Sequence, residues 1–541
     1  MAFGPGPTYL HAVTPRHTPS WIALLPALLA LAALAAHLDL LCDDAFISFR
    51  YARNLARGDG LVFNPGESPP VEGYSNLLWV LYLAPFSGLG LDLGLVARLT
   101  SAACALVLVA WTARHAARRL ELDGAGTALT ALFLATLPAT ALWATGGLAT
   151  MPFALALFAV WALLDHGPGE SGRTPLAVVA AVLAVLLRAD GFLWLGLLVG
   201  GLLLGLPLLE PDERRARLRS LLAVGLAVAL SFGAQVAFRL GYYGDWLPNT
   251  ARVKAGLSAA RLSRGLDHAA QWLLSMPALA LVLVASLRRA PRGEGPLAIT
   301  AWTLVLGGVG YSIWVGGDFM PYGRFLVPTL PFVALLFASL WRRLEGRSRP
   351  AAAAVGLVLV GLGVGSAFGL DAVPRSVRAR FHFRLSNPSG WQSELEMRDA
   401  MEARAEEWTT KGRALALFTG EGDSIVLKGI GAIGYHGDLF VYDVHGLVSP
   451  EVIAASGEPR ADASPGHDRE VPTTYFFQRP DPPTLAGAFF APLGAPAEAG
   501  LPPGFRQHPL FSRLTVERHP LPEAAGFPPA TELRLLRLRQ P

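Results

Sequence analysis

The chain has 541 residues, of which 52% are hydrophobic and 16% are charged, and its mean hydropathy is +0.41. Soluble domains carry about 25% charged residues, so this composition excludes an ordinary soluble protein, a disordered chain and a coiled coil. Lysine and arginine number 45 against 41 aspartate and glutamate, and the resulting charge of +4 is too small to indicate nucleic-acid binding. Two cysteines are too few for a disulfide-stapled scaffold.

Long apolar stretches recur along the first two thirds of the chain. A helix that crosses a bilayer needs about 20 mostly apolar residues. We predict eleven spans on this basis, at Trp21–Ala36, Gly94–Thr112, Gly124–Thr140, Leu148–Leu164, Pro175–Leu187, Phe192–Leu209, Leu221–Phe238, Gln271–Leu287, Pro296–Val315, Phe325–Trp341 and Ala351–Leu370. Leu77–Phe86 is shorter, and we predict an interfacial or re-entrant helix there.

The basic residues of the short loops orient these spans. With the N-terminus in the cytoplasm, arginines gather in inner loops such as 114–119, 214–219 and 342–349, whereas the short outer turns hold Arg188 and Arg324. Cytoplasmic loops carry an excess of lysine and arginine. The pattern therefore predicts a multi-pass membrane protein whose C-terminal segment lies outside the cell.

The composition changes after residue 370. Residues 371–541 contain no spanning run, and a charged helical stretch at Glu394–Trp408 precedes strand-like stretches at Ala414–Phe418 and Leu439–Asp443. We predict two domains, a transmembrane domain at 1–370 and a small extracytoplasmic α/β domain at 371–541. The predicted fold class is thus an α-helical polytopic membrane protein of about eleven transmembrane helices with a C-terminal α/β domain.

The first outer loop, residues 40–76, is the richest in polar residues. Ala45–Leu55 suits an amphipathic helix that carries Arg50 on a basic face, and Asp43 and Asp44 stand at its start. A carboxylate there can cap the helix. It can equally take a proton from an attacking hydroxyl group, or hold a divalent cation such as Mg²⁺ or Mn²⁺. We therefore treat both aspartates as candidate catalytic residues and candidate metal ligands.

Further charged and polar residues gather at the outer ends of spans that are distant in sequence. A charge near the membrane core is costly and usually functional, and the mixture of acids and bases favours one shared site over arginines that merely anchor helix ends. We predict that the following residues bind donor or substrate: Arg50, Tyr51, Asn54, Glu72, Tyr74, Asn76, Arg188, Asp190, Arg239, Tyr243, Asn249, Lys254, Asp318 and Arg324.

One glycine motif points to another chemistry. Gly429-Ile-Gly431-Ala-Ile-Gly434 matches G-x-G-x-x-G, but a dinucleotide site needs a helix directly after these glycines. The residues that follow, Tyr435-His-Gly-Asp and a strand-like stretch, predict no such helix. We therefore expect no nucleotide cofactor.

Several motifs resemble those of a known family. The chain resembles the GT-C-type membrane glycosyltransferases that use polyprenyl-phosphate sugars, and most closely the terminal arabinofuranosyltransferase (AftB-like) family. The resemblance rests on these segments: Asp-Asp-Ala-Phe-Ile-Ser-Phe-Arg-Tyr-Ala-Arg-Asn at 43–54, Leu-Val-Phe-Asn-Pro-Gly-Glu at 61–67, Val-Glu-Gly-Tyr-Ser-Asn at 71–76, Tyr-Tyr-Gly-Asp-Trp-Leu-Pro-Asn-Thr at 242–250, Gly-Gly-Asp-Phe-Met at 316–320 and Gly-Arg-Phe-Leu-Val-Pro at 323–328.

This resemblance implies a GT-C fold in the bacterial cytoplasmic membrane, with the active site and the C-terminal domain on the extracytoplasmic side. Asp43 and Asp44 correspond to the family's catalytic carboxylates. The implied partners are a polyprenyl-phosphate sugar, most simply a pentofuranose such as arabinose, a cell-envelope glycan acceptor and the lipid bilayer. The chain departs from the family at Ala149, where Gly-Leu-Ala-Thr replaces Gly-Leu-Glu-Thr.

The residues suggest a division of roles within such a reaction. Asp43 or Asp44 would act as general base or charge partner. Three basic residues, Arg50, Lys254 and Arg324, would hold the leaving phosphate. Tyr74, Asn76 and Asn249 are placed to hydrogen-bond the sugar.

Two alternatives remain open. A secondary transporter or lipid-linked sugar flippase would bind its substrate midway through the membrane, although the spans carry almost no internal charge. A catalytically silent envelope-assembly protein is the other alternative, since Ala149 replaces an acidic residue.

Overall fold

The computed structural model describes residues 21–539 except for 166–172, 254–255, 257, 289–292, 382–390, 461–462, 464–465, 497–498, 500, 502–508 and 524–525. In the first part of the chain the helices are η1 Trp21–Leu24, α1 Leu25–His37, α2 Asp43–Arg57, α3 Leu77–Gly88, α4 Leu93–Leu120, α5 Gly124–Thr136, α6 Pro138–Trp143, α7 Thr150–Leu164, α8 Thr174–Leu187, α9 Gly191–Gly205, η3 Leu206–Leu208 and α10 Pro211–Tyr242. The helices that follow are α11 Asn249–Val253, α12 Ala259–Ser275, α13 Pro277–Ser286, α14 Gly295–Trp314, η4 Arg324–Thr329, α15 Leu330–Glu345, α16 Arg349–Ala367, α17 Arg375–Arg378 and α18 Glu394–Phe418. The last elements are β1 Ser424–Leu427, α19 Gly431–Gly437, β2 Phe440–Asp443, α20 Glu451–Ala455, η5 Thr473–Gln478, β3 Leu485–Pro492, η7 Pro509–Arg513, β4 Leu514–Pro520 and β5 Thr531–Leu538.

Most of the long apolar helices coincide with predicted spans. Among the described residues, six continuous helices are long and apolar enough to cross a membrane: α4, α9 with η3, α10, α14, η4 with α15, and α16. A seventh crossing is possible through α12 and α13, which meet at an angle of 98°. Four further predicted spans fall on shorter apolar helices, namely η1 with α1, α5, α7 and α8. The chain is therefore a multi-pass membrane protein, and the count of eleven spans stays a prediction.

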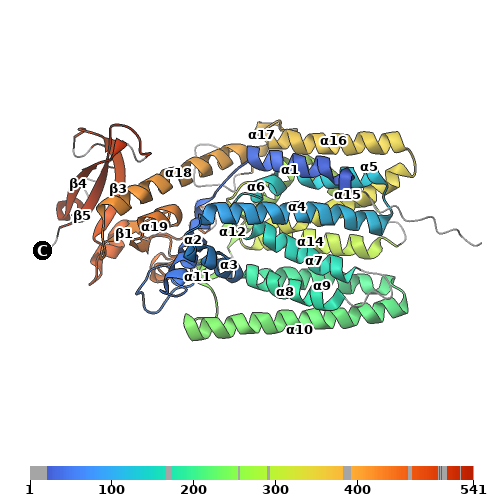
Figure 1. Ribbon diagram of the computed structural model, residues 1–541, viewed down its shortest axis with the longest axis horizontal. Coiled ribbons are helices and arrows are strands. Elements are labelled where there is room, and N and C mark those ends of the chain that lie inside the picture. The colour runs from blue at the N-terminus through green and yellow to red at the C-terminus, as the bar shows by residue number, and fades with distance from the viewer. Residues whose placement is uncertain are drawn as a thin grey trace, which may run out of the picture.

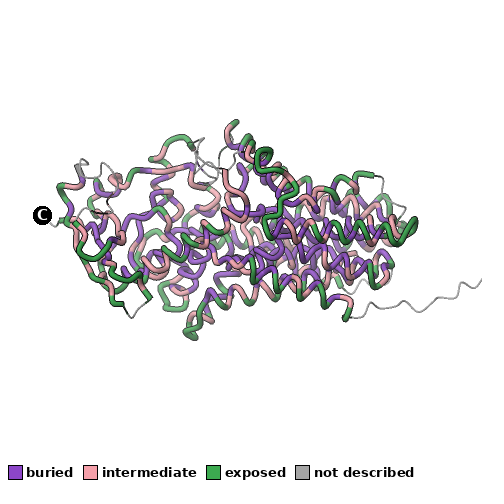
Figure 2. The backbone as a smooth tube through the Cα atoms, turned by 90° about the horizontal axis from the view of Figure 1, so that it is seen from above, coloured by how far each residue is buried: buried purple, intermediate pink, exposed green. Residues whose placement is uncertain are grey.

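The helices form one bundle, and α10 runs along one margin of it (Figure 1). Of the apolar window of the η4–α15 span, 94% is buried inside the protein, against 17% for α10. Large side chains fill the centre, where the rings of Phe133 and Phe337 stack at 4.7 Å. Figure 2 shows buried stretches along the inside of the bundle and exposed stretches at its margins. Exposed leucines on α10, such as Leu222 and Leu230, suit contact with lipid tails.

A mixed sheet lies at the other end of the molecule (Figure 1). Its strand order is β2-β1-β3-β5-β4, in which β1 runs parallel to β2 and β3, while β5 runs antiparallel to β3 and β4. Helix α18 extends from the bundle to the sheet, and the side chains of Ser393 and Glu396 form a capping box at its start. The predicted strand at Leu439–Asp443 matches β2.

One predicted strand is wrong. Residues 414–418 form the last turns of α18, because the helix begun by the capping box continues to Phe418. Its alanines and leucines, Ala414, Leu415, Ala416 and Leu417, are all good helix formers, and the buried Ala414 and Leu415 alternate with exposed neighbours at helical spacing.

Helix α2 occupies the junction between the bundle and the sheet (Figure 1). It begins after Cys42, whose backbone is extended, and ends at Gly58, which adopts a φ of 92° and donates its backbone N–H to the carbonyl groups of Asn54 and Leu55. Glycine is the usual residue where the C-cap of a helix adopts the left-handed backbone conformation. Both predicted features of this segment, an amphipathic helix and two aspartates in its first turn, are confirmed. The helix packs against α3 on one side and α19 on another.

Candidate active site

The structure brings Asp44 together with Asp318 and Arg324, which lie more than 270 residues later in one loop. Arg324 donates from Nε to Asp318 Oδ2 at 3.2 Å, and its Nη1 lies 3.7 Å from Asp44 Oδ2. The side chain of Asp318 is buried, whereas that of Asp44 is 38% exposed. The Asp44 carboxylate therefore faces open space while it remains in contact with a cation.

The loop between α14 and η4 places this triad. Gly316 and Gly317 both have a φ of 86°, and Gly323 has a φ of 64°, conformations that a residue with a Cβ rarely adopts. A Cβ on Gly317 would lie 2.8 Å from Cβ of His268, so α12 packs closely against the turn. Asp318 is thereby held beneath the start of η4, where Arg324 begins the helix.

Arg188 and Asp190 form a second charged pair nearby. Arg188 donates from Nε and Nη2 to the two carboxylate oxygens of Asp190, both at 2.7 Å. The guanidinium of Arg188 lies 5.5 Å from the ring centre of Phe325, and that of Arg324 lies 5.0 Å from the same ring. Both arginines thus lie near the same aromatic ring, which places the Arg188–Asp190 pair beside the Asp44–Asp318–Arg324 triad. We call these five charged residues the outer cluster.

The sequence did not reveal Tyr311 as a member of this neighbourhood. Its hydroxyl group donates a hydrogen bond to Asp190, and its ring lies 6.0 Å from that of Phe325. It sits within the apolar run of α14, where a tyrosine looks like any other buried aromatic residue. A polar aromatic side chain one turn before the Trp314 end of a span was the available signal.

The segment between α6 and α7 packs against the residues on either side of Asp43 and Asp44. Cys42 donates its thiol hydrogen to the carbonyl oxygen of Gly146, and a Cβ on Gly147 would lie 2.9 Å from Cβ of Ala45. The position that departs from the family motif, Ala149, directly follows this contact and is buried at the start of α7. Ala149 thus lies two residues after a glycine that packs against the first turn of α2.

Asp43 has surroundings quite different from those of Asp44. Its Oδ2 accepts the backbone N–H of Gly431 at 3.2 Å, and its Oδ1 accepts that of Ala432 at 2.6 Å. Burial raises the pKa of Asp43 to about 7, against the opposing effect of these hydrogen bonds. Both oxygens thus bind the C-terminal part of the chain.

Arg50 does not join the outer cluster, contrary to its predicted role as a phosphate ligand. Its side chain is completely buried, and it donates to the carbonyl groups of Phe63, Gly434 and Leu439 at 2.5 to 2.7 Å. Its guanidinium also lies 4.2 Å from the ring centre of Phe63. The carbonyl groups compensate the buried charge, which explains why this arginine faces the protein.

A second group of predicted residues forms a polar network that we call the loop clasp. Glu72, in the loop of residues 40–76, accepts a hydrogen bond of 2.8 Å from Arg239 at the end of α10, and both side chains are buried. Asn249 donates to the carbonyl groups of Gly446 and Leu447 at 2.6 and 2.7 Å. These contacts join the first loop, α10 and the C-terminal part.

Three tyrosines complete the loop clasp. Tyr51 donates to the carbonyl group of Val71 at 2.7 Å and accepts the backbone N–H of Gly73 at 2.8 Å. The hydroxyl groups of Tyr74 and Tyr243 lie 3.1 Å apart, and their rings pack at 6.4 Å. All three tyrosines are buried, so the contacts they make are internal to the protein.

The remaining predicted residues are two asparagines and a lysine. Asn54 donates to the carbonyl groups of Val62 and Phe63 and holds the first loop closed. Asn76 exchanges hydrogen bonds with Ser48 on α2 at 3.0 and 3.2 Å. Lys254 lies outside the described residues.

The side chains do not fit the predicted metal site. Both oxygens of Asp43 accept backbone hydrogen bonds, and Asp44 instead contacts Arg324. Across the residues described by the structure, no group of three or more His, Cys, Asp and Glu side chains is arranged to hold a metal ion. The cationic groups that the structure places in the outer cluster are the guanidinium groups of Arg188 and Arg324.

A helix does follow the G-x-G-x-x-G motif, which corrects the expectation from sequence. Strand β1 ends at Leu427, α19 begins at Gly431 and β2 runs parallel to β1, so the motif sits at a strand-to-helix turn. The first backbone N–H groups of α19 already bind the Asp43 carboxylate. A phosphate group would have to displace that carboxylate, so the turn offers no open nucleotide site.

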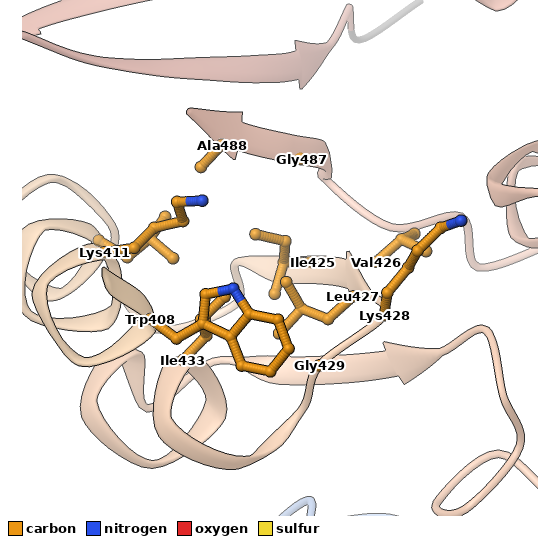
Figure 3. Close-up of a pocket in the computed structure, with 11 residues that line it drawn as sticks. Trp408, Lys411, Ile425, Val426, Leu427, Lys428, Gly429, Ile433, Gly487 and Ala488 are labelled. Carbon is orange, nitrogen blue, oxygen red and sulfur yellow. The ribbon is translucent and has the colours of Figure 1, made fainter. Parts of the chain in front are cut away.

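A pocket of about 180 Å³ lies beside this turn (Figure 3). Trp408 and Lys411 of α18 form one side, β1 residues such as Ile425 lie at its base, and Ala488 of β3 stands opposite. None of the predicted site residues lines it. It is therefore separate from the outer cluster.

Comparisons with known proteins bear on both parts of the chain. Two curated relatives named terminal β-(1→2)-arabinofuranosyltransferase, from Mycobacterium tuberculosis and Corynebacterium glutamicum, are each 30% identical to it over 336 residues. That match covers 54% of this chain and 51% and 46% of the two relatives, so the chain spans about half the length of the curated relatives it matches. A family model described as a domain of unknown function (DUF8728) matches residues 396–486.

Solved structures of ArnT from Cupriavidus metallidurans match nearly the entire fold. The apo structure aligns with a TM-score of 0.52 at 14% identity, and the structure bound to undecaprenyl phosphate aligns with a TM-score of 0.51 at 11% identity. Both alignments cover 95% of this chain and 97% of ArnT. The chain has the GT-C fold. The resemblance inferred from the first-loop motifs is thereby confirmed, both in fold and in its curated homologues.

Proposed function

We propose that this GT-C chain is a glycosyltransferase that transfers a sugar from a polyprenyl phosphate to a hydroxyl group of a cell-envelope glycan. The outer cluster carries the proposal, because three distant segments bring an accessible carboxylate and two arginines together. The names of the curated relatives make an arabinofuranosyl unit the first sugar to test.

The proposed reaction is a single displacement at the anomeric carbon. The acceptor oxygen forms a bond to that carbon while the bond from the carbon to the phosphate oxygen breaks. The leaving polyprenyl phosphate takes the electron pair, and Asp44 takes the proton of the acceptor hydroxyl group. Its partial exposure and its contact with Arg324 allow Asp44 to meet both substrate and cation.

Arginine supplies the electrostatic part of catalysis in this proposal. Arg324 has five N–H donors, of which Asp318 and Asp44 engage some, and the others would bind the departing phosphate. Negative charge grows on that phosphate in the transition state, so donors aimed at it lower the barrier. Arg188, whose guanidinium group also lies near the Phe325 ring, supplies a second positive charge beside its partner Asp190.

The fold supports a lipid-linked donor. ArnT was solved with undecaprenyl phosphate bound, and a polyprenyl tail here would lie between helices at the height of the outer cluster. We place the reaction and the C-terminal part on the extracytoplasmic face of the bacterial cytoplasmic membrane, as the distribution of arginine in the loops predicts.

The test is a panel of radiolabelled polyprenyl-phosphate sugars offered to purified protein in proteoliposomes with an arabinan or other envelope glycan. We expect a new glycosidic product from at least one pentofuranose donor. Movement of the label across the bilayer without any product, for every donor in the panel, would instead establish the transporter alternative. The absence of both a product and movement of the label would favour the assembly-protein alternative.

A further inference from the structure

The three glycines of the G-x-G-x-x-G motif each allow a different close contact. A Cβ on Gly431 would lie 2.0 Å from the backbone oxygen of Asp43 and 2.6 Å from its Cγ, and a Cβ on Gly434 would lie 3.0 Å from Nη1 of Arg50. A Cβ on Gly429 would lie 2.1 Å from the Trp408 ring, which stands beside this glycine in Figure 3. Two of the three glycines are therefore needed for contact with α2.

The basic face of α2 completes this interface. Arg50 donates to the carbonyl groups of Gly434 and Leu439, and Arg53 donates to the carbonyl group of Tyr435. Two ion pairs follow along the helix, because Arg53 and Arg57 bind the two oxygens of Asp438 at 2.5 and 2.6 Å. The side chains of Arg50, Arg53 and Arg57 thus all bind α19 or the residues directly after it.

Aromatic side chains fill the space between the two helices. The Phe46 ring lies 5.7 Å from Tyr435 and 5.4 Å from His436, and Phe49 lies 6.1 Å from Tyr435. The interface therefore combines a buried carboxylate, arginine–carbonyl contacts and packed rings. We call it the α2–α19 latch, and its residues are 43–57 on one side and 431–438 on the other.

We propose that Asp43 is a positioning residue, which fixes Asp44 in the outer cluster by holding α2 against α19. Successive residues of a helix point about 100° apart. The Asp43 side chain faces α19 and the Asp44 side chain faces Arg324. When Asp43 holds α2 against α19, the rotation of α2 about its axis is fixed, and the side chain of Asp44 is directed toward Arg324. The role of Asp44 in this statement rests on the proposed function, whereas the latch itself does not.

Hydrogen–deuterium exchange of the full chain in nanodiscs tests the latch. Asp43→Asn replaces the charged hydrogen-bond acceptor with a neutral amide. Gly431→Ala adds a methyl group that would clash with the backbone oxygen of Asp43. We expect each change to speed exchange in residues 431–437 about tenfold or more, the size expected for lost hydrogen bonds to a charged group. Gly420→Ala is the matched control, since a Cβ there would meet no atom within 4 Å. Unchanged exchange in Asp43→Asn would overturn the latch.

Transfer activity, measured on the same variants, separates positioning from direct catalysis. We expect activity to fall in step with the loss of protection in Asp43→Asn and Gly431→Ala, and Asp43→Glu, which keeps a carboxylate, to recover part of both. Asp44→Asn should lose activity with exchange unchanged. If Asp43→Asn abolished transfer while α19 stayed fully protected, Asp43 would be a catalytic residue and the proposal would fail. Should no donor support transfer, the exchange data still decide on the latch.

Discussion

Asp43 and Asp44 are neighbours in sequence, yet their surroundings differ and support different roles. Asp43 has both oxygens on the backbone of α19, and Asp44 is partly exposed beside Arg324. A general base needs access to the hydroxyl group from which it takes a proton. Exposure and the nearby cation therefore favour Asp44 as the base, while Asp43 supports the helix that carries it.

Arg324 should not be replaceable by lysine. Its planar fork spans Asp318 and Asp44 at once, and a lysine ammonium is a single point charge that matches a phosphate less well. We expect Arg324→Lys to lower kcat/KM for transfer about 100-fold, measured with the donor that supports activity. Arg252→Lys, which affects an exposed pair with Asp245, is the control. Equal rates for the two variants would argue against a role for the fork.

Two residues of the α2–α19 latch should respond to pH in opposite directions. Burial lowers the pKa of His436 from 6.5 to about 4, with Arg413 and Arg53 adding to the effect. Burial raises the pKa of Asp43 from 3.8 to about 7, with Asp44 adding to this shift and Arg404 opposing it. Between pH 6.5 and 4 the unfolded chain therefore binds more protons at His436 than the native chain does. The contribution of this histidine to stability decreases as the pH is lowered through this range. The contribution of Asp43 to stability increases as the pH is lowered through the same range, because here the native chain binds more protons than the unfolded one.

This opposition gives a prediction for the His436→Gln variant. Because the variant lacks the unfavourable protonation, its melting temperature should rise relative to that of the unmodified protein as the pH is lowered from 7 to 5. Thermal unfolding in detergent at several pH values measures the difference. A difference that is constant over this range would contradict the assigned pKa of His436.

Among the structural elements, the loop clasp depends most on a buried ion pair. Glu72 and Arg239 are 5% and 6% exposed, and removal of one partner leaves the other charge buried without compensation. We expect Glu72→Gln to lower the free energy of unfolding by about 3 kcal/mol, seen as a lower melting temperature. Asp245→Asn, whose partner Arg252 is 44% exposed, should cost less than about 1 kcal/mol. Similar losses in the two variants would contradict the account of the clasp.

The same elements show what the sequence was able to predict. Apolar runs locate the long helices, because burial in lipid requires them, and the acid–base pattern at their ends locates the outer cluster. The pattern did not distinguish Arg324 from Arg50, because both are arginines near the membrane surface and only the fold decides whether carbonyl groups or open space surround them. The helix α19 was missed because it has seven residues, three of them glycine.

At the scale of the whole molecule, the arginine-rich loops predict the orientation in the membrane, and this prediction is open to a direct test. In a chain with Cys104→Ala, whose Cys42 is buried, we introduce Glu421→Cys before β1 or Glu210→Cys before α10. Both positions are exposed. A membrane-impermeant maleimide should label the first in intact cells and the second only after permeabilisation. The reverse pattern would invert the topology and place the outer cluster in the cytoplasm.

The central proposal for the whole chain is that Asp44, in the outer cluster of this GT-C fold, removes the proton of an acceptor hydroxyl group. The most direct measurement is the rate of glycosidic product formation by purified Asp44→Asn, with a donor that the unmodified protein uses. We predict a rate at least about 100-fold lower, with unchanged exchange protection in α19 and full activity for the control Asp39→Asn, a partly exposed partner of Arg98. Full transfer by Asp44→Asn would contradict the account.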